Sequence, residues 1–126
     1  MENLGLYYDG SEEGGAMTKV KPITPKLIQT MVHRLVHQFS SEQVILFGSQ
    51  ARGNAGPDSD VDLLVVTPVS GSKREKEIEM RVALHDIAVP KDIIVVTPDE
   101  FERKRNVVGT IVYPALREGK VLHVRR

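Results

Sequence analysis

Two short runs of large apolar residues, LLVV at 63–66 and IIVV at 93–96, constrain the fold of this 126-residue chain most strongly. A run of this length is typical of a strand that is covered on both faces over part of its length. A third run, QVILFG at 43–48, has the same character. The three segments predict the centre of a β-sheet that packs against helices.

Helices are predicted between and around these runs. At 24–39, Thr24 suits an N-cap, Pro25 suits the first helical position, and apolar residues repeat at helical spacing. Segments 72–87 and 98–118 also predict helix, the second interrupted near Pro114 and closed by Gly119. A last short strand is predicted at 120–124, so helices and strands share one α/β (α+β) fold.

Composition bounds the class of protein. Residues 1–18 are rich in glycine and acid without a hydrophobic period, which predicts a flexible tail before one domain at 19–126. Lysine plus arginine equals aspartate plus glutamate, 17 of each, which argues against nucleic acid or an anionic membrane as partner. The chain has no cysteine, no membrane-length apolar run and no signal-peptide pattern, so a cytoplasmic location is expected.

Three aspartates stand at the starts of the predicted strands. Asp60 and Asp62 share one face of strand 60–68, where two like charges are costly unless a cation lies between them. Asp92 opens the strand at 91–97 in the same relative position. If the strands are neighbours, the three carboxylates could hold two Mg²⁺ ions about 3.5–4 Å apart, the arrangement used for phosphoryl transfer.

A phosphate-binding turn is predicted just upstream. Gly48 and Ser49 end the first strand and start a helical turn, whose backbone N–H groups attract phosphate, and Arg52 lies one turn later. Each feature alone is often only a turn or a strand entry. Their combination predicts an active site that binds a triphosphate next to metal ions.

The pattern F-G-S, ten residues, then D-V-D-L resembles the signature of the nucleotidyltransferase superfamily that includes DNA polymerase beta, and in particular its minimal nucleotidyltransferase (MNT) branch. The resemblance implies a small mixed sheet with helices mainly on one face. It implies transfer of a nucleoside monophosphate, as AMP from ATP, to a hydroxyl acceptor. Gly48, Ser49 and Arg52 would hold the nucleotide, and Asp60, Asp62 and Asp92 would bind Mg²⁺ and carry catalysis.

Partners also follow from the resemblance. Many MNT proteins are antitoxins of HEPN-domain toxins, and the MNT member adenylylates a tyrosine of the toxin. Two alternatives stay open: a catalytically weak antitoxin that neutralises its partner by binding, and a nucleotidyltransferase acting on a small molecule. Either a homo-oligomer or a hetero-oligomer fits these readings.

The chain departs from its relatives where they commonly carry arginine, at Gln50 and near Gly56. Four nearby cations could compensate, but charged helix ends exposed to solvent are the preferred interpretation of each: Lys73, Arg74, Arg103 and Lys104. A charge run is predicted to be a solvated helical face: Glu100, Glu102, Arg103, Lys104 and Arg105. His33 and His37, one helical turn apart, are expected to be exposed rather than to bind metal.

Overall fold

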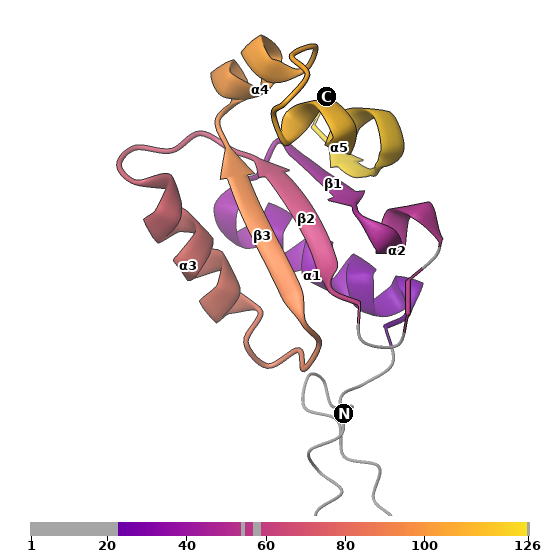
Figure 1. Ribbon diagram of the computed structural model, residues 1–126. Coiled ribbons are helices and arrows are strands. Elements are labelled where there is room, and N and C mark those ends of the chain that lie inside the picture. Colours follow the sequence, from indigo (N-terminus) through magenta and orange to yellow (C-terminus); the bar gives the residue numbers. More distant parts are fainter. Residues whose placement is uncertain (1–22, 54, 57–58, 126) are drawn as a thin grey trace, which may run out of the picture.

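The computed structural model describes residues 23–53, 55–56 and 59–125 and contains a four-stranded sheet in the order β3-β2-β1-β4 (Figure 1). The inner strand β1 is antiparallel to both of its neighbours, β2 and β4, whereas β2 and β3 are parallel. The sheet is therefore mixed, as expected. The strands are β1 Gln43–Phe47, β2 Val61–Val66, β3 Lys91–Val96 and β4 Lys120–Val124.

In the described part of the chain, five helices surround the sheet. The two longest, α1 and α3, pack on one face, and the short helices α4 and α5 cover part of the other (Figure 1). The very short α2 follows β1 directly. The helices are α1 Pro25–Phe39, α2 Ser49–Arg52, α3 Lys73–Ala83, α4 Pro98–Lys104 and α5 Val112–Glu118. The predicted α+β fold is confirmed, and the predicted tail at 1–18 lies outside the described residues.

Strand β2 separates two hydrophobic cores. Leu63 and Val65 point toward α1 and α3, while Leu64 and Val66 point toward α4 and α5. All four are buried, which explains why LLVV is continuously apolar. Asp62 shares the face of Leu64, beside the strand end where the site is expected.

The helix boundaries agree with the sequence in part. The hydroxyl of Thr24 accepts a hydrogen bond from the Leu27 N–H at 3.1 Å, which fixes the start of α1. Helix α3 ends at Ala83, earlier than predicted. Pro114 does not interrupt a helix as predicted, because it lies in the first turn of α5, where N–H groups need no helical partner.

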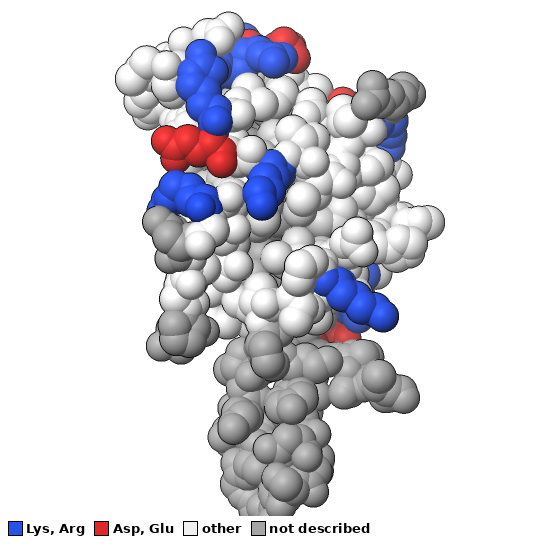
Figure 2. Space-filling view, turned by 90° about the vertical axis from the view of Figure 1, so that its right-hand side faces the viewer, with Lys and Arg blue, Asp and Glu red and all other residues white. Residues whose placement is uncertain are grey.

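On the side shown in Figure 2, the surface has no extended region where charges of one sign gather. This view looks at the side of α2 and α5, where Lys and Arg side chains stand in separate places around a broad uncharged area. No helix among the described residues is long and apolar enough to cross a membrane. His33 and His37 are both exposed, with their rings 4.0 Å apart.

Glu100 is not solvated as predicted, because it lies buried between two lysines. Its carboxylate accepts hydrogen bonds from Lys73 Nζ at 2.8 Å and Lys104 Nζ at 2.7 Å, and so joins the start of α3 to α4. Burial alone would raise the pKa of Glu100, but the two lysines lower it to about 2. The cluster stabilises the end of the sheet opposite to the aspartates.

We expect Glu100→Gln to lower the free energy of unfolding by about 1–3 kcal/mol at pH 7, because charged hydrogen bonds are lost. A pKa lowered by folding stabilises the protein above the ordinary value near 4.5, and this stabilisation is lost as pH falls toward 2. Urea unfolding of both proteins between pH 7 and pH 2 should therefore show a difference that shrinks with acid. The exposed neighbour Glu102 provides the control, and Glu102→Gln should change stability by less than about 0.5 kcal/mol.

Candidate active site

The parallel register of β2 and β3 places Asp62 directly beside Asp92. Asp60 precedes β2 by one residue and is exposed, while Asp62 and Asp92 are half-buried. The amino ends of two neighbouring strands thus carry all three predicted aspartates. As metal ligands, the side chains of these three aspartates offer only carboxylate oxygens, which suit a hard divalent cation such as Mg²⁺.

Negative charge is concentrated at Asp62. Burial, followed by the charges of Asp60 and Asp92, raises the pKa of the Asp62 carboxyl, and the nearby Arg52 guanidinium partly opposes this. Carboxylates that raise one another's pKa gain free energy when a cation joins them. The residues present therefore fit the divalent cation that the motif predicts.

Gly48 makes room for the Asp62 carboxylate. Antiparallel pairing sets Phe47 opposite Asp62, so the next residue of the chain passes over the aspartate side chain. Gly48 has φ +75°, and a Cβ atom there would lie 2.3 Å from Asp62 Oδ2. Only glycine allows both this backbone conformation and this close approach.

The turn after Gly48 is the predicted phosphate-binding element. The Gly48 carbonyl accepts hydrogen bonds from the N–H groups of Ala51 and Arg52, both at 3.1 Å, which form the turn of α2. Arg52 is exposed, and its guanidinium lies 3.8 Å from a Glu118 carboxylate oxygen in a loose ion pair. Arg52 is close enough to Asp62 for its charge to act on the pKa of that carboxyl, and Ser49 follows Gly48 directly. Contact of either residue with a nucleotide stays a prediction.

The three aspartates do not converge on one point. Within the described ranges, no three His, Asp or Glu side chains form a group that could hold a metal ion as they stand. Asp92 is instead paired with Arg81 of α3, whose Nη2 donates to Asp92 Oδ1 at 2.9 Å. Sequence reasoning missed Arg81, although a helix that precedes a parallel strand must end near that strand's start.

Two of the cations that could compensate for Gln50 and Gly56 lie elsewhere. Lys73 and Lys104 bind Glu100 at the carboxyl ends of β2 and β3, at the opposite end of the sheet from the aspartates. They therefore do not reach a triphosphate held at Gly48.

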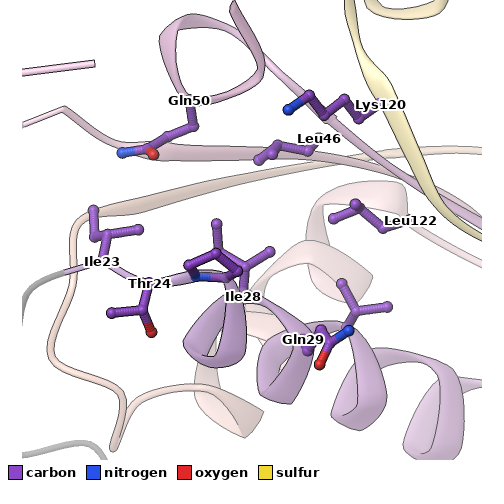
Figure 3. Close-up of a pocket in the computed structure, with 10 residues that line it drawn as sticks. Ile23, Thr24, Ile28, Gln29, Leu46, Gln50, Lys120 and Leu122 are labelled. Atoms are coloured by element: carbon purple, nitrogen blue, oxygen red, sulfur yellow. The ribbon is translucent and has the colours of Figure 1, made fainter. Parts of the chain in front are cut away.

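Gln50 lies on the α1 side of the sheet. Its side chain lines an apolar pocket of about 340 Å³ between α1, β1 and β4, together with Leu46 and Lys120 (Figure 3). Its amide also lies 3.5 Å from the Ser59 carbonyl oxygen. Gln50 therefore lies between this pocket and the segment directly before Asp60.

The model of the nucleotidyltransferase domain family matches residues 28–115. The chain belongs to the nucleotidyltransferase domain family. The match spans the Gly48 turn and all three aspartates of the nucleotidyltransferase domain, while a comparison with curated protein sequences finds no match.

Solved structures share the fold. A toxin–antitoxin structure with AMP-PNP is 17% identical and covers 78% of this chain and 74% of its own, with a TM-score of 0.51. A mutant of the toxin–antitoxin MntA–HpeT is 16% identical with the same coverage and a TM-score of 0.50. A Sulfolobus solfataricus protein described as a nucleotidyltransferase is 30% identical over 62% of this chain and 70% of its own, with a TM-score of 0.49.

We expect Gly48→Ala to displace the Asp62 carboxylate and to weaken Mn²⁺ binding about tenfold or more. It should also destabilise the fold by about 1–2 kcal/mol, because alanine at φ +75° is strained. Mn²⁺ titration and urea unfolding measure the two effects. Gly53→Ala is the matched control, since Gly53 has φ +81° with nothing within 4 Å of an added Cβ. This control should lose stability and keep its Mn²⁺ affinity.

We expect Asp62→Asn to stabilise the metal-free protein at pH 7 to 8. A carboxyl whose pKa is raised by folding destabilises the folded state above that pKa, and asparagine removes this penalty. The advantage should shrink as acid protonates Asp62 in the wild type. Thermal unfolding in EDTA at several pH values measures it, with the exposed Asp99→Asn as control. An advantage that grows toward acid would contradict the assignment.

Proposed function

We propose that this protein is a Mg²⁺-dependent nucleotidyltransferase that transfers AMP from ATP to a hydroxyl of a partner protein, as the antitoxin of a toxin–antitoxin pair. The proposal rests on one arrangement: Asp62 and Asp92 are direct neighbours on parallel strands, and Gly48 packs closely against the Asp62 carboxylate. This arrangement brings the carboxylates and the predicted phosphate-binding turn to one edge of the sheet.

Each residue of this edge has a role in the proposed reaction. Asp60 and Asp62 hold divalent cations, two in number, and Asp92 completes the site. When bound, such cations neutralise phosphate charge and align the reacting groups. The backbone of Gly48 and Ser49 binds the triphosphate, and Arg52 contacts its oxygens.

The transfer itself is a displacement at the α-phosphorus. The acceptor hydroxyl oxygen forms a bond to this phosphorus as the bond to the β-phosphate oxygen breaks, and pyrophosphate leaves. Asp92 accepts the proton of the hydroxyl. Catalysis rests on positioning and on charge stabilisation, because no covalent intermediate on the protein is needed.

The partner is proposed from two supports. The sequence resembles MNT antitoxins, whose acceptor is a tyrosine of a HEPN toxin. The toxin–antitoxin structures that share the fold include one with AMP-PNP and one with two aspartates, two positions apart, exchanged for glutamate. The two exchanged aspartates of the second structure have the same spacing as Asp60 and Asp62.

A catalytically weak antitoxin is the second candidate. The pairing of Asp92 with Arg81 favours it, because the third carboxylate is already engaged. Such a protein would neutralise its toxin by forming a complex, without transferring a nucleotide. The two candidates differ in what they require of Asp60 and Asp62.

We expect the protein, incubated with Mg²⁺, α-labelled ATP and its toxin, to label the toxin, and Asp62→Asn to reduce labelling at least about 10³-fold. Asp99→Asn makes the same charge change at the far end of the sheet and should keep full activity. Autoradiography and mass spectrometry of the toxin measure transfer and locate the modified hydroxyl.

The same variants separate the two candidates in a growth assay. A nucleotidyltransferase antitoxin loses neutralisation when Asp60 and Asp62 are both replaced by asparagine, although the complex still forms. Full neutralisation by this double variant would favour the binding antitoxin. Absence of label in a confirmed complex would count against transfer to this partner.

A further inference from the structure

Arg81 forms an ion pair with Asp92, the third carboxylate of the proposed site. It lies in the last turn of α3, and its Nη2 is 2.9 Å from Asp92 Oδ1. The two side chains are 42% and 48% exposed, so they can separate without unpacking the core. The protein thus places a cation of its own on the third carboxylate.

Asp92 is flanked from two sides. Helix α3 lies along β3, the edge strand, while β2 with Asp62 is the inner neighbour of β3 (Figure 1). Arg81 therefore holds the Asp92 carboxylate on the outer side of the strand, and Asp62 lies on the inner side. Among the described residues, the three aspartates share an edge but form no group that could hold a metal ion as it stands.

We propose that Arg81 is a positioning residue that competes with the divalent cation for Asp92. In the free protein, Arg81 keeps Asp92 on the α3 side. Asp92 joins Asp60 and Asp62 when the incoming cation displaces the guanidinium. The inference rests on the proposed function, because it assumes a cation site at these aspartates.

The size of the effect follows from the exposure of the pair. Exposed ion pairs contribute little to stability because water and salt screen them. Arg81 therefore weakens cation binding at Asp92 slightly and does not prevent it. Removing its charge should tighten cation binding by about two- to fivefold, the range that a weak ion pair allows.

A purely structural role for Arg81 gives a different result. If the ion pair only ties α3 to β3, Arg81→Met lowers the thermal midpoint and leaves cation affinity unchanged. If Arg81 acts only as a general positive charge near the site, its removal tightens binding whether or not Asp92 is a carboxylate. Only competition for Asp92 requires both residues.

The test is a Mn²⁺ titration followed by electron paramagnetic resonance on four proteins: wild type, Arg81→Met, Asp92→Asn and the double variant. We expect Arg81→Met to bind Mn²⁺ about two- to fivefold more tightly than wild type, and the double variant to bind like Asp92→Asn alone. Arg74→Met, the same substitution at the other end of α3, is the control and should match wild type.

Three results would overturn the inference. Equal or weaker Mn²⁺ binding by Arg81→Met would leave only a structural role. A gain that persists in the Asp92→Asn background would show a general charge effect. Absence of Mn²⁺ binding by wild type would remove the metal site of the proposed function and the inference with it, whereas the first two results leave that site intact.

Discussion

The parallel pairing of β2 with β3 is the constraint on which the site depends. Parallel neighbours need a crossover, and α3 supplies it. The pairing aligns Asp62 with Asp92, thirty positions apart in the sequence. Because α3 runs back along the sheet, its last turn returns to the start of β3 and brings Arg81 to Asp92. The β2-α3-β3 unit therefore brings together Asp62, Asp92 and Arg81, the side chain proposed to compete for Asp92.

The antiparallel pairing of β1 with β2 adds the second half of the site. It makes the end of β1 coincide with the start of β2, so the turn after Phe47 crosses Asp62. The close approach is possible because position 48 is glycine. The predicted phosphate-binding turn and the carboxylates are thus brought together by backbone pairing, before any ligand is present.

Local signals in the sequence predicted much of this. Apolar runs marked the central strands, helical periodicity with Thr24 and Pro25 marked α1, and the two-residue spacing put Asp60 and Asp62 on one side. Features that depend on a partner from another element were missed or misread. Glu100 looked solvated because its burial depends on Lys73, 27 positions away, and Arg81 looked like one more charge on α3.

The charged side chains at this edge do not act equally on the three aspartates. Arg81 pairs with Asp92, while burial, followed by the charges of Asp60 and Asp92, raises the pKa of Asp62 and the charge of Arg52 opposes this rise. Arg52 therefore offsets only part of the cost of keeping Asp62 charged in the metal-free protein. In the proposed site, a divalent cation beside Asp62 would relieve this cost, and Arg81 would set how readily Asp92 joins it.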